Sequence, residues 1–140
     1  MPAMSAKKVS KSELLESIFD RLCKLHSNFS PPLEIYSRHI KNKRDFNLRI
    51  PKAVSIPPAY GGKPVQLDLA GLILQKGYVG FYFTPIYLNP ALKSKLSPSL
   101  LKNLKGKTCF YIRKLDEDQI KNIEFALGEG VKLYKQKGWL

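Results

Sequence analysis

The sequence predicts a single α+β domain, and three observations lead to this prediction. Amphipathic helical patterns lie near both ends of the 140-residue chain. Between them, residues 65–75 and 78–84 form two β-rich runs joined by Lys76-Gly77, a pair suited to a tight hairpin turn. A third β-rich run covers residues 107–114. This order is typical of an antiparallel sheet with the N- and C-terminal helices packed on one face.

The two terminal helices carry recognisable start sites. The first is expected over residues 10–26, where Ser10 and Glu13 form a capping box. Its apolar face consists of Leu14, Leu15, Ile18, Phe19 and Leu22. The last helix begins at Asp116, a capping residue with Gln119 three positions later. Its interior contains Gly128 and Gly130, which we expect to permit a close crossing over the sheet.

The remaining segments are less regular. Residues 33–64 suggest only short extended pieces, with a long mobile loop near 51–63 that is broken by proline and glycine. Asn89-Pro90 and Ser97-Pro98 each place a capping side chain before a proline, which predicts two short helices. Residues 1–9 are expected to be a basic disordered tail, and residues 10–140 the domain.

Side chains alternate between the two faces of a strand, so a two-residue turn fixes which residues of the hairpin share a face. One face carries Ala70, Leu72, Leu74, Val79, Phe81 and Phe83, and the other carries Gly71, Ile73, Gln75, Tyr78, Gly80 and Tyr82. The third run repeats this division, since Phe110 and Ile112 alternate with Cys109, Tyr111 and Arg113. We expect the phenylalanine face to lie beneath the helices. The tyrosine face should be open, with a shallow trough at Gly71 and Gly80.

This open face is the candidate ligand site. Its expected binding residues are Tyr78, Tyr82, Tyr111, Arg113 and Lys107. Tyrosine offers a wide contact area with a polar tip, although an ordinary solvated sheet face has a similar composition.

The charge of the chain indicates the class of partner. Net charge is +13, and no acidic residue lies between Asp68 and Asp116. Such a surface favours an anionic small molecule or an acidic protein. Nucleic acid is an alternative partner, because lysines contact phosphates and tyrosines stack on bases.

A carboxylate group on the first helix is a candidate metal site. Glu13, Glu16 and Asp20 are spaced so that they lie on one side of the helix, where carboxylates can hold a hard cation or ferrous iron. The alternative is a solvated helix face in which Asp20 pairs with Lys24.

No residue pattern points to catalysis, so we expect a protein that is not an enzyme. His26 and His39 match no metal-ligand spacing, and no nucleophile elbow or phosphate-binding glycine loop is present. A nucleophilic pair of Cys109 with histidine would need a thiol activated by its surroundings. Cys23 and Cys109 form no motif, which fits a reduced cytoplasmic protein. The sequence contains no run of about 18 apolar residues, so we expect no membrane span.

Three sequence blocks resemble the YdhG-like family of bacterial domains: QKGYVGFYFTPIYLNP at 75–90, LKGKTCFYIRKLD at 104–116, and LYKQKGWL at 133–140. The resemblance implies an antiparallel sheet covered on one face by the terminal helices, and a small stand-alone protein without assigned enzyme activity. Some members are labelled frataxin-like iron chaperones, which implies iron handling by Glu13, Glu16 and Asp20. The leading hypothesis is a non-enzymatic binding module; the alternatives are a frataxin-like iron chaperone and a nucleic-acid-binding protein.

Overall fold

The computed structural model describes residues 9–55 and 63–140, so residues 1–8 of the expected tail and residues 56–62 of the expected loop lie outside it. Within the described residues, a six-stranded antiparallel sheet has the order β1-β2-β5-β6-β8-β7. Its strands are β1 (Glu34–Tyr36), β2 (Asp45–Arg49), β5 (Asp68–Gln75), β6 (Tyr78–Phe83), β7 (Leu104–Lys105) and β8 (Cys109–Ile112). A separate two-stranded sheet pairs β3 (Val54–Ser55) with β4 (Pro64–Val65).

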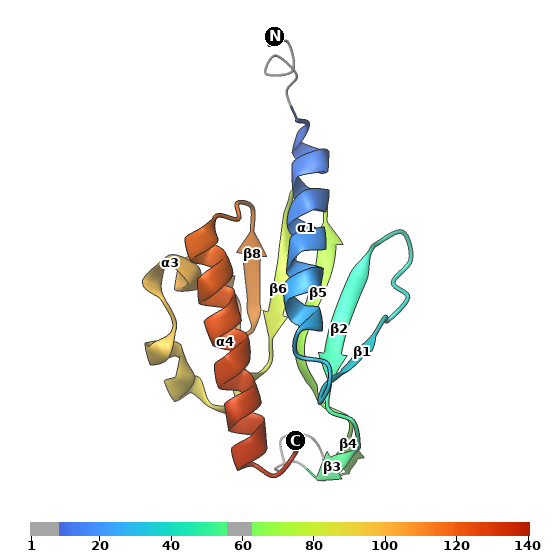
Figure 1. Ribbon diagram of the computed structural model, residues 1–140, viewed down its shortest axis with the longest axis vertical. Coiled ribbons are helices and arrows are strands. Elements are labelled where there is room, and N and C mark those ends of the chain that lie inside the picture. The colour runs from blue at the N-terminus through green and yellow to red at the C-terminus, as the bar shows by residue number, and fades with distance from the viewer. Residues whose placement is uncertain (1–8, 56–62) are drawn as a thin grey trace.

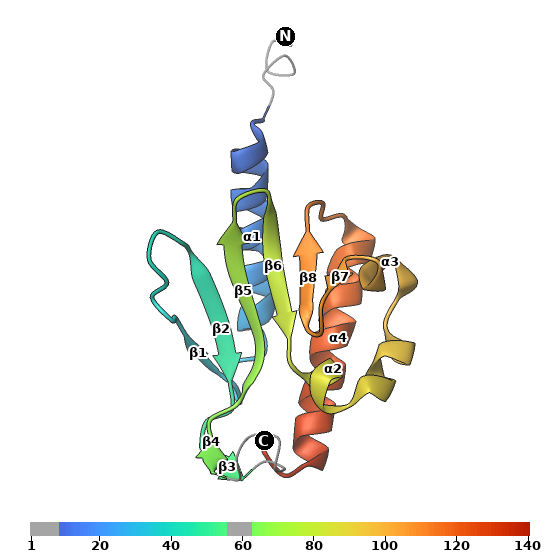
Figure 2. The same ribbon diagram turned by 180° about the vertical axis from the view of Figure 1, so that it is seen from behind.

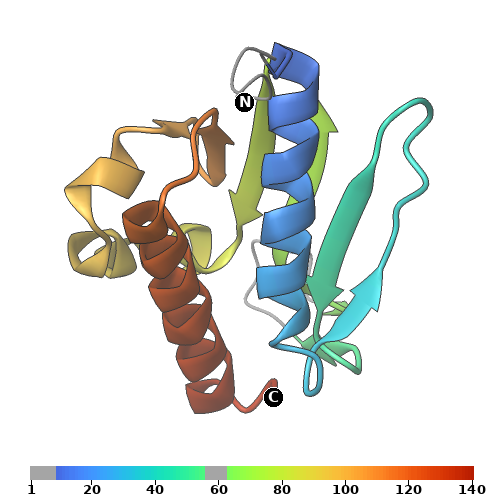
Figure 3. The ribbon, with the colours of Figure 1, turned by 45° about the horizontal axis from the view of Figure 1, so that its top comes forward.

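Two long helices, α1 (Lys11–Ser27) and α4 (Glu117–Gln136), lie on the same side of the six-stranded sheet (Figure 1). Helix α1 packs against β5 and β6, and α4 lies beside it over the other half of the sheet (Figure 3). Short helical segments α2 (Pro85–Leu88), η3 (Pro90–Lys95) and α3 (Pro98–Leu101) connect β6 to β7. The layering predicted from the sequence is therefore confirmed.

The predicted helix starts are present. The Glu13 N–H donates to Ser10 Oγ, and the Ser10 N–H donates to the Glu13 carboxylate, each at 3.1 Å. The Gln119 N–H donates to Asp116 Oδ1 at 2.8 Å. At the second proline pair, Ser97 Oγ accepts from the N–H of Ser99, whereas the side chain of Asn89 makes no capping hydrogen bond.

The β5–β6 hairpin has the register that the sequence predicts. All six pairs match, from Ala70 opposite Phe83 to Gln75 opposite Tyr78. Lys76 and Gly77 form the turn, and the positive φ of 103° at Gly77 is a backbone conformation that glycine adopts without strain. The run expected at 65–75 is divided, because β4 ends at Val65 and β5 begins only at Asp68.

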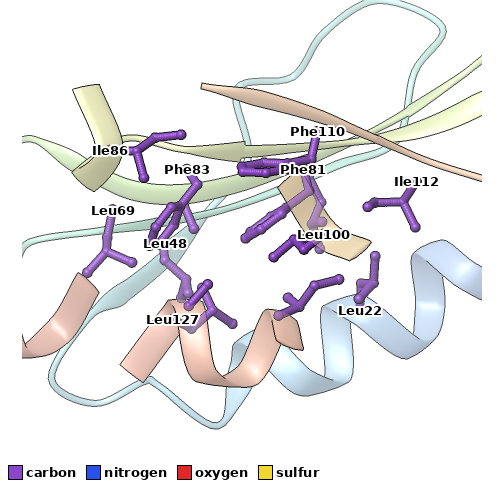
Figure 4. Packing of buried hydrophobic residues seen from close by; sticks show 14 of the residues in the cluster. Leu22, Leu48, Leu69, Phe81, Phe83, Ile86, Leu100, Phe110, Ile112 and Leu127 are labelled. Atoms are coloured by element: carbon purple, nitrogen blue, oxygen red, sulfur yellow. The ribbon is translucent and has the colours of Figure 1, made fainter. Parts of the chain in front are cut away.

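The core fills the space between the helices and the sheet. The phenylalanine rings of the central strands are fully buried and meet α1 and α4 there (Figure 4). Members of this cluster include Leu22, Leu48, Phe81, Phe83, Phe110, Ile112 and Leu127.

The two glycines of α4 have different surroundings. A Cβ on Gly130 would lie 3.0–3.2 Å from atoms of Pro85, Phe83 and Leu69, so this glycine permits the close crossing. A Cβ on Gly128 would meet no atom within 4 Å. The prediction is therefore right for Gly130 and wrong for Gly128.

Candidate functional site

The candidate site lies on the sheet face that the helices leave uncovered. Figure 2 shows β5, β6 and β8 from this side, with α1 and α4 behind them. Tyr78, Tyr82 and Tyr111 are half-buried here, while Phe81 and Phe110 on the same strands are fully buried on the helical side. The predicted division of the aromatic residues between the two faces is confirmed.

Tyr78 and Tyr111 form a stacked aromatic pair beside Arg113. Their rings are stacked, with centroids 3.8 Å apart and planes 9° from parallel. The guanidinium carbon of Arg113 lies 5.8 Å from the Tyr78 ring centroid and 5.6 Å from that of Tyr111, in the range of cation–π attraction. The hydrogen bond with Tyr111, followed by burial, raises the pKa of Tyr78 to about 12. Tyr78 therefore stays protonated at neutral pH and adds no negative charge beside Arg113.

Tyr82 fills the part of the predicted trough that lies over Gly80. A Cβ on Gly80 would come within 2.9 Å of Tyr82 Cε1, so the tyrosine ring occupies the space that the glycine leaves. Burial, followed by a hydrogen bond to Cys109, raises the pKa of Tyr82. The expectation of an empty trough at this position is wrong.

Lys107 lies apart from the three tyrosines named above. Its Nζ is 5.4 Å from the ring centroid of Tyr87 in α2, and the side chain is exposed. The structure thus brings four of the five predicted ligand residues to one surface and directs Lys107 to a neighbouring one.

The trough at Gly71 is partly filled and partly open. A Cβ on Gly71 would be 2.3 Å from Asn47 Oδ1, so the Asn47 side chain lies over the glycine. Asn47 is almost fully buried and donates to Asp45 Oδ2 at 2.7 Å. Next to it is a hollow of about 260 Å³ whose lining includes Gly71, Tyr82 and Thr84.

Polar side chains from four separate segments converge on this hollow. Arg38, Asp68, Thr84 and Thr108 contribute to its lining. The N–H of Thr84 donates to Leu69 O at 3.1 Å, and Thr108 O accepts from the N–H of Phe83 at 2.9 Å, which fixes both threonines at the end of β6.

Asp68 is already satisfied by two donors. Its carboxylate accepts from the Tyr36 hydroxyl at 2.5 Å and from the Arg38 guanidinium. The hydrogen bond to Asp68 raises the pKa of Arg38, so the guanidinium stays charged. The sequence analysis did not identify Arg38 as a site residue or its pairing with Asp68. Because 30 residues separate the pair, no local pattern could have revealed it.

The segment in and around β7 and β8 is rich in basic side chains. In the part of the chain that the structure describes, Lys102, Lys105, Lys107, Arg113 and Lys114 form no ion pair. Only Lys95, among the basic residues between Asp68 and Asp116, has an acidic partner there, Glu129 at 3.4 Å.

The candidate metal residues have other partners. Arg44 donates to Glu16 and Asp20 at 2.8 Å each, and Glu13 caps α1. No group of three or more His, Cys, Asp or Glu side chains among the described residues is arranged to hold a metal ion. Asp20 pairs with Arg44, not with Lys24 as the solvated-face alternative supposed.

Neither cysteine is an activated nucleophile. Burial raises the pKa of the Cys23 thiol to about 12, and burial also raises the pKa of Cys109. Both thiols therefore remain protonated at neutral pH, and a protonated thiol is a poor nucleophile.

Among the described residues, no helix combines the length and apolar character that crossing a bilayer requires. Comparison of the chain with protein-family models, curated proteins and solved structures finds no match.

Proposed function

We propose that this protein is a non-enzymatic binding module that holds a small anionic molecule on the open face of its sheet. The observation that carries the proposal is the hollow beside Gly71, lined by Arg38, Thr84 and Thr108 on a face without covering helices. A concave site with a few convergent polar groups is the usual form of a small-molecule site.

The chemistry of the hollow supports an anionic group on the ligand. Both carboxylate oxygens of Asp68 already accept hydrogen bonds from Tyr36 and Arg38, so this lining carboxylate is occupied by partners within the protein. The two threonine hydroxyls and the remaining N–H groups of Arg38 are donors for a carboxylate or phosphate.

Size and charge narrow the class of partner. A volume of about 260 Å³ lies below the roughly 300–1,000 Å³ of drug-sized sites, which favours a compact metabolite over an acidic protein. The unpaired cations around Arg113 attract anions towards this face, an effect that weakens with salt. The YdhG-like sequence blocks agree with a role outside catalysis.

The test is an NMR titration of the full chain with citrate and with inorganic phosphate as probes. Saturable shifts of the amides of Gly71, Ile73, Thr84 and Thr108 are expected. Thr108→Val should weaken citrate binding by up to about tenfold, the loss of one hydrogen bond. Ser94→Ala removes a hydroxyl whose partner is Ala91 O, outside the hollow, and should leave the affinity unchanged. Shifts confined to α1 and α4 would contradict the proposal.

A further inference from the structure

A second concave surface lies at the end of the sheet where the β5–β6 turn is, and it is separate from the hollow described above. It is a groove of about 760 Å³ between the first turns of α1, the segment that leads into β2, and the β5–β6 turn. The N–H of Leu74 donates to Arg44 O at 2.9 Å, which holds the segment before β2 against the end of β5.

The groove has an apolar part. Leu15 of α1 is 5% exposed, and Leu74 of β5 is half-buried; both contribute to the lining. These leucines belong to the edge of the core, where α1 lies over β5 and its N-terminal turns approach the end of the hairpin (Figure 3). Covering their exposed atoms with an apolar group is favourable by about 25 cal/mol per Å².

The rim of the groove is cationic. Four basic side chains and a single carboxylate line it, an excess of three positive charges. The carboxylate, Glu16, already pairs with Arg44. Lys11, Lys43 and Lys76 are exposed and form no ion pair within residues 9–55 and 63–140. The Lys43 Nζ donates to Gln75 Oε1 at 2.6 Å, which fixes this ammonium at the rim.

We infer that this groove binds a small amphiphile with a carboxylate head, whose chain covers Leu15 and Leu74 while its head lies among Lys11, Lys43 and Lys76. Charge complementarity selects the head, because three lysines that line the groove have no acidic partner among the described residues. The apolar lining selects the chain, and the volume lies within the range of sites that enclose a small molecule. The site is independent of the hollow on the open face, since the two share no lining residue.

The test uses octanoate as the probe, with octanol and acetate as matched molecules that lack the charge or the chain. In an NMR titration of the full chain, octanoate should give saturable shifts at Leu15, Leu74 and Gly77. Octanol and acetate should bind at least about tenfold more weakly, because each lacks one half of the recognition. Equal binding of octanoate and octanol, or shifts on the open sheet face instead, would overturn the inference.

A charge-matched pair of variants tests the cationic rim. The triple variant Lys11→Gln, Lys43→Gln and Lys76→Gln should weaken octanoate binding at least about tenfold. The control variant, Lys121→Gln, Lys132→Gln and Lys135→Gln, changes the net charge equally on α4 and should bind as the original chain does. Equal weakening of octanoate binding by both variants would show that the overall charge of the protein, and not the rim of the groove, determines the affinity. That result would overturn the inference. Binding to phosphatidylglycerol vesicles without binding of monomeric octanoate would show that the ligand is a membrane surface and not a single amphiphile. That result would also overturn the inference.

Discussion

The ring of Tyr78 lies parallel to the ring of Tyr111 on the open face, with 3.8 Å between the centroids. Each ring covers one face of the other, so the pair packs as a stack. Stacked aromatic pairs contribute about 1 kcal/mol beyond the area that they bury. A double-mutant cycle with Tyr78→Leu and Tyr111→Leu should therefore show a coupling of about 1 kcal/mol in the free energy of unfolding in urea. A control cycle of Tyr78→Leu with Phe125→Leu, on the opposite side of the molecule, should show additive effects.

The same pair makes a prediction about alkaline titration. Tyr78 should ionise near pH 12, because the hydrogen bond with Tyr111 stabilises its protonated form. Tyr111→Phe removes that hydrogen bond and should lower the pKa of Tyr78 towards its ordinary value. The tyrosinate absorbance, compared with that of Tyr78→Phe to assign the transition, provides the measurement. An unchanged midpoint in Tyr111→Phe would show that the hydrogen bond does not set the pKa of Tyr78.

A buried histidine should make stability depend on pH. His26 is fully buried in T-shaped contact with Phe46 and Phe81, with Nδ1 2.8 Å from Leu22 O and no partner for Nε2 among the described residues. Burial lowers its pKa from 6.5 to about 4. Between these two pKa values, the imidazole of His26 is therefore protonated in the unfolded chain and neutral in the folded chain. Stability from this residue is complete above pH 6.5 and should fall by roughly 3 kcal/mol as the pH decreases to about 4.

Chemical denaturation at several pH values measures this slope. His26→Gln keeps an uncharged polar side chain and should flatten the curve between pH 4 and pH 6.5, the range set by the two pKa values. A curve for His26→Gln that is as steep as the original would assign the effect to other groups.

Two glycines in one helix should respond in opposite directions to the same substitution. Gly128→Ala adds a methyl group in open space and removes a poor helix former, so it should stabilise the protein by up to about 1 kcal/mol. Gly130→Ala places its methyl group against Pro85, Phe83 and Leu69 and should destabilise it by about 1–3 kcal/mol. Thermal unfolding of the two variants checks the difference in sign. Stabilisation by both would mean that α4 shifts away from the sheet at little cost.

The parts of the fold that the sequence predicted well depend on local signals. The β5–β6 register follows from one two-residue turn, and Asp116 marks the start of α4 within its own segment. β2 and β7 were not predicted as defined strands. β2 pairs with β5, in which the partner residues lie 19 to 28 positions later, and β7 has only two residues. Local patterns carry little information about pairings over such a separation.

The candidate site likewise has one part that local sequence signals predict and one part that they do not. The common face of Tyr78, Tyr82 and Tyr111 follows from alternation along the strands, so the sequence was sufficient to predict it. The hollow depends on Asn47 lying over Gly71 and on Arg38 reaching Asp68, and both contacts join segments that are distant in the chain. The direction of Lys107 towards Tyr87 likewise depends on where α2 follows β6.

The short strands at both edges of the six-stranded sheet have a consequence for behaviour at high concentration. β1 has three residues and β7 has two, and they carry Glu34 and Lys105 respectively. A long, flat outer strand would offer a row of unpaired amides and carbonyls on which a neighbouring molecule can extend the sheet. The short, charged edge strands β1 and β7 do not offer that template. We therefore expect this protein to resist fibrillar aggregation although its central strands are aromatic and β-forming.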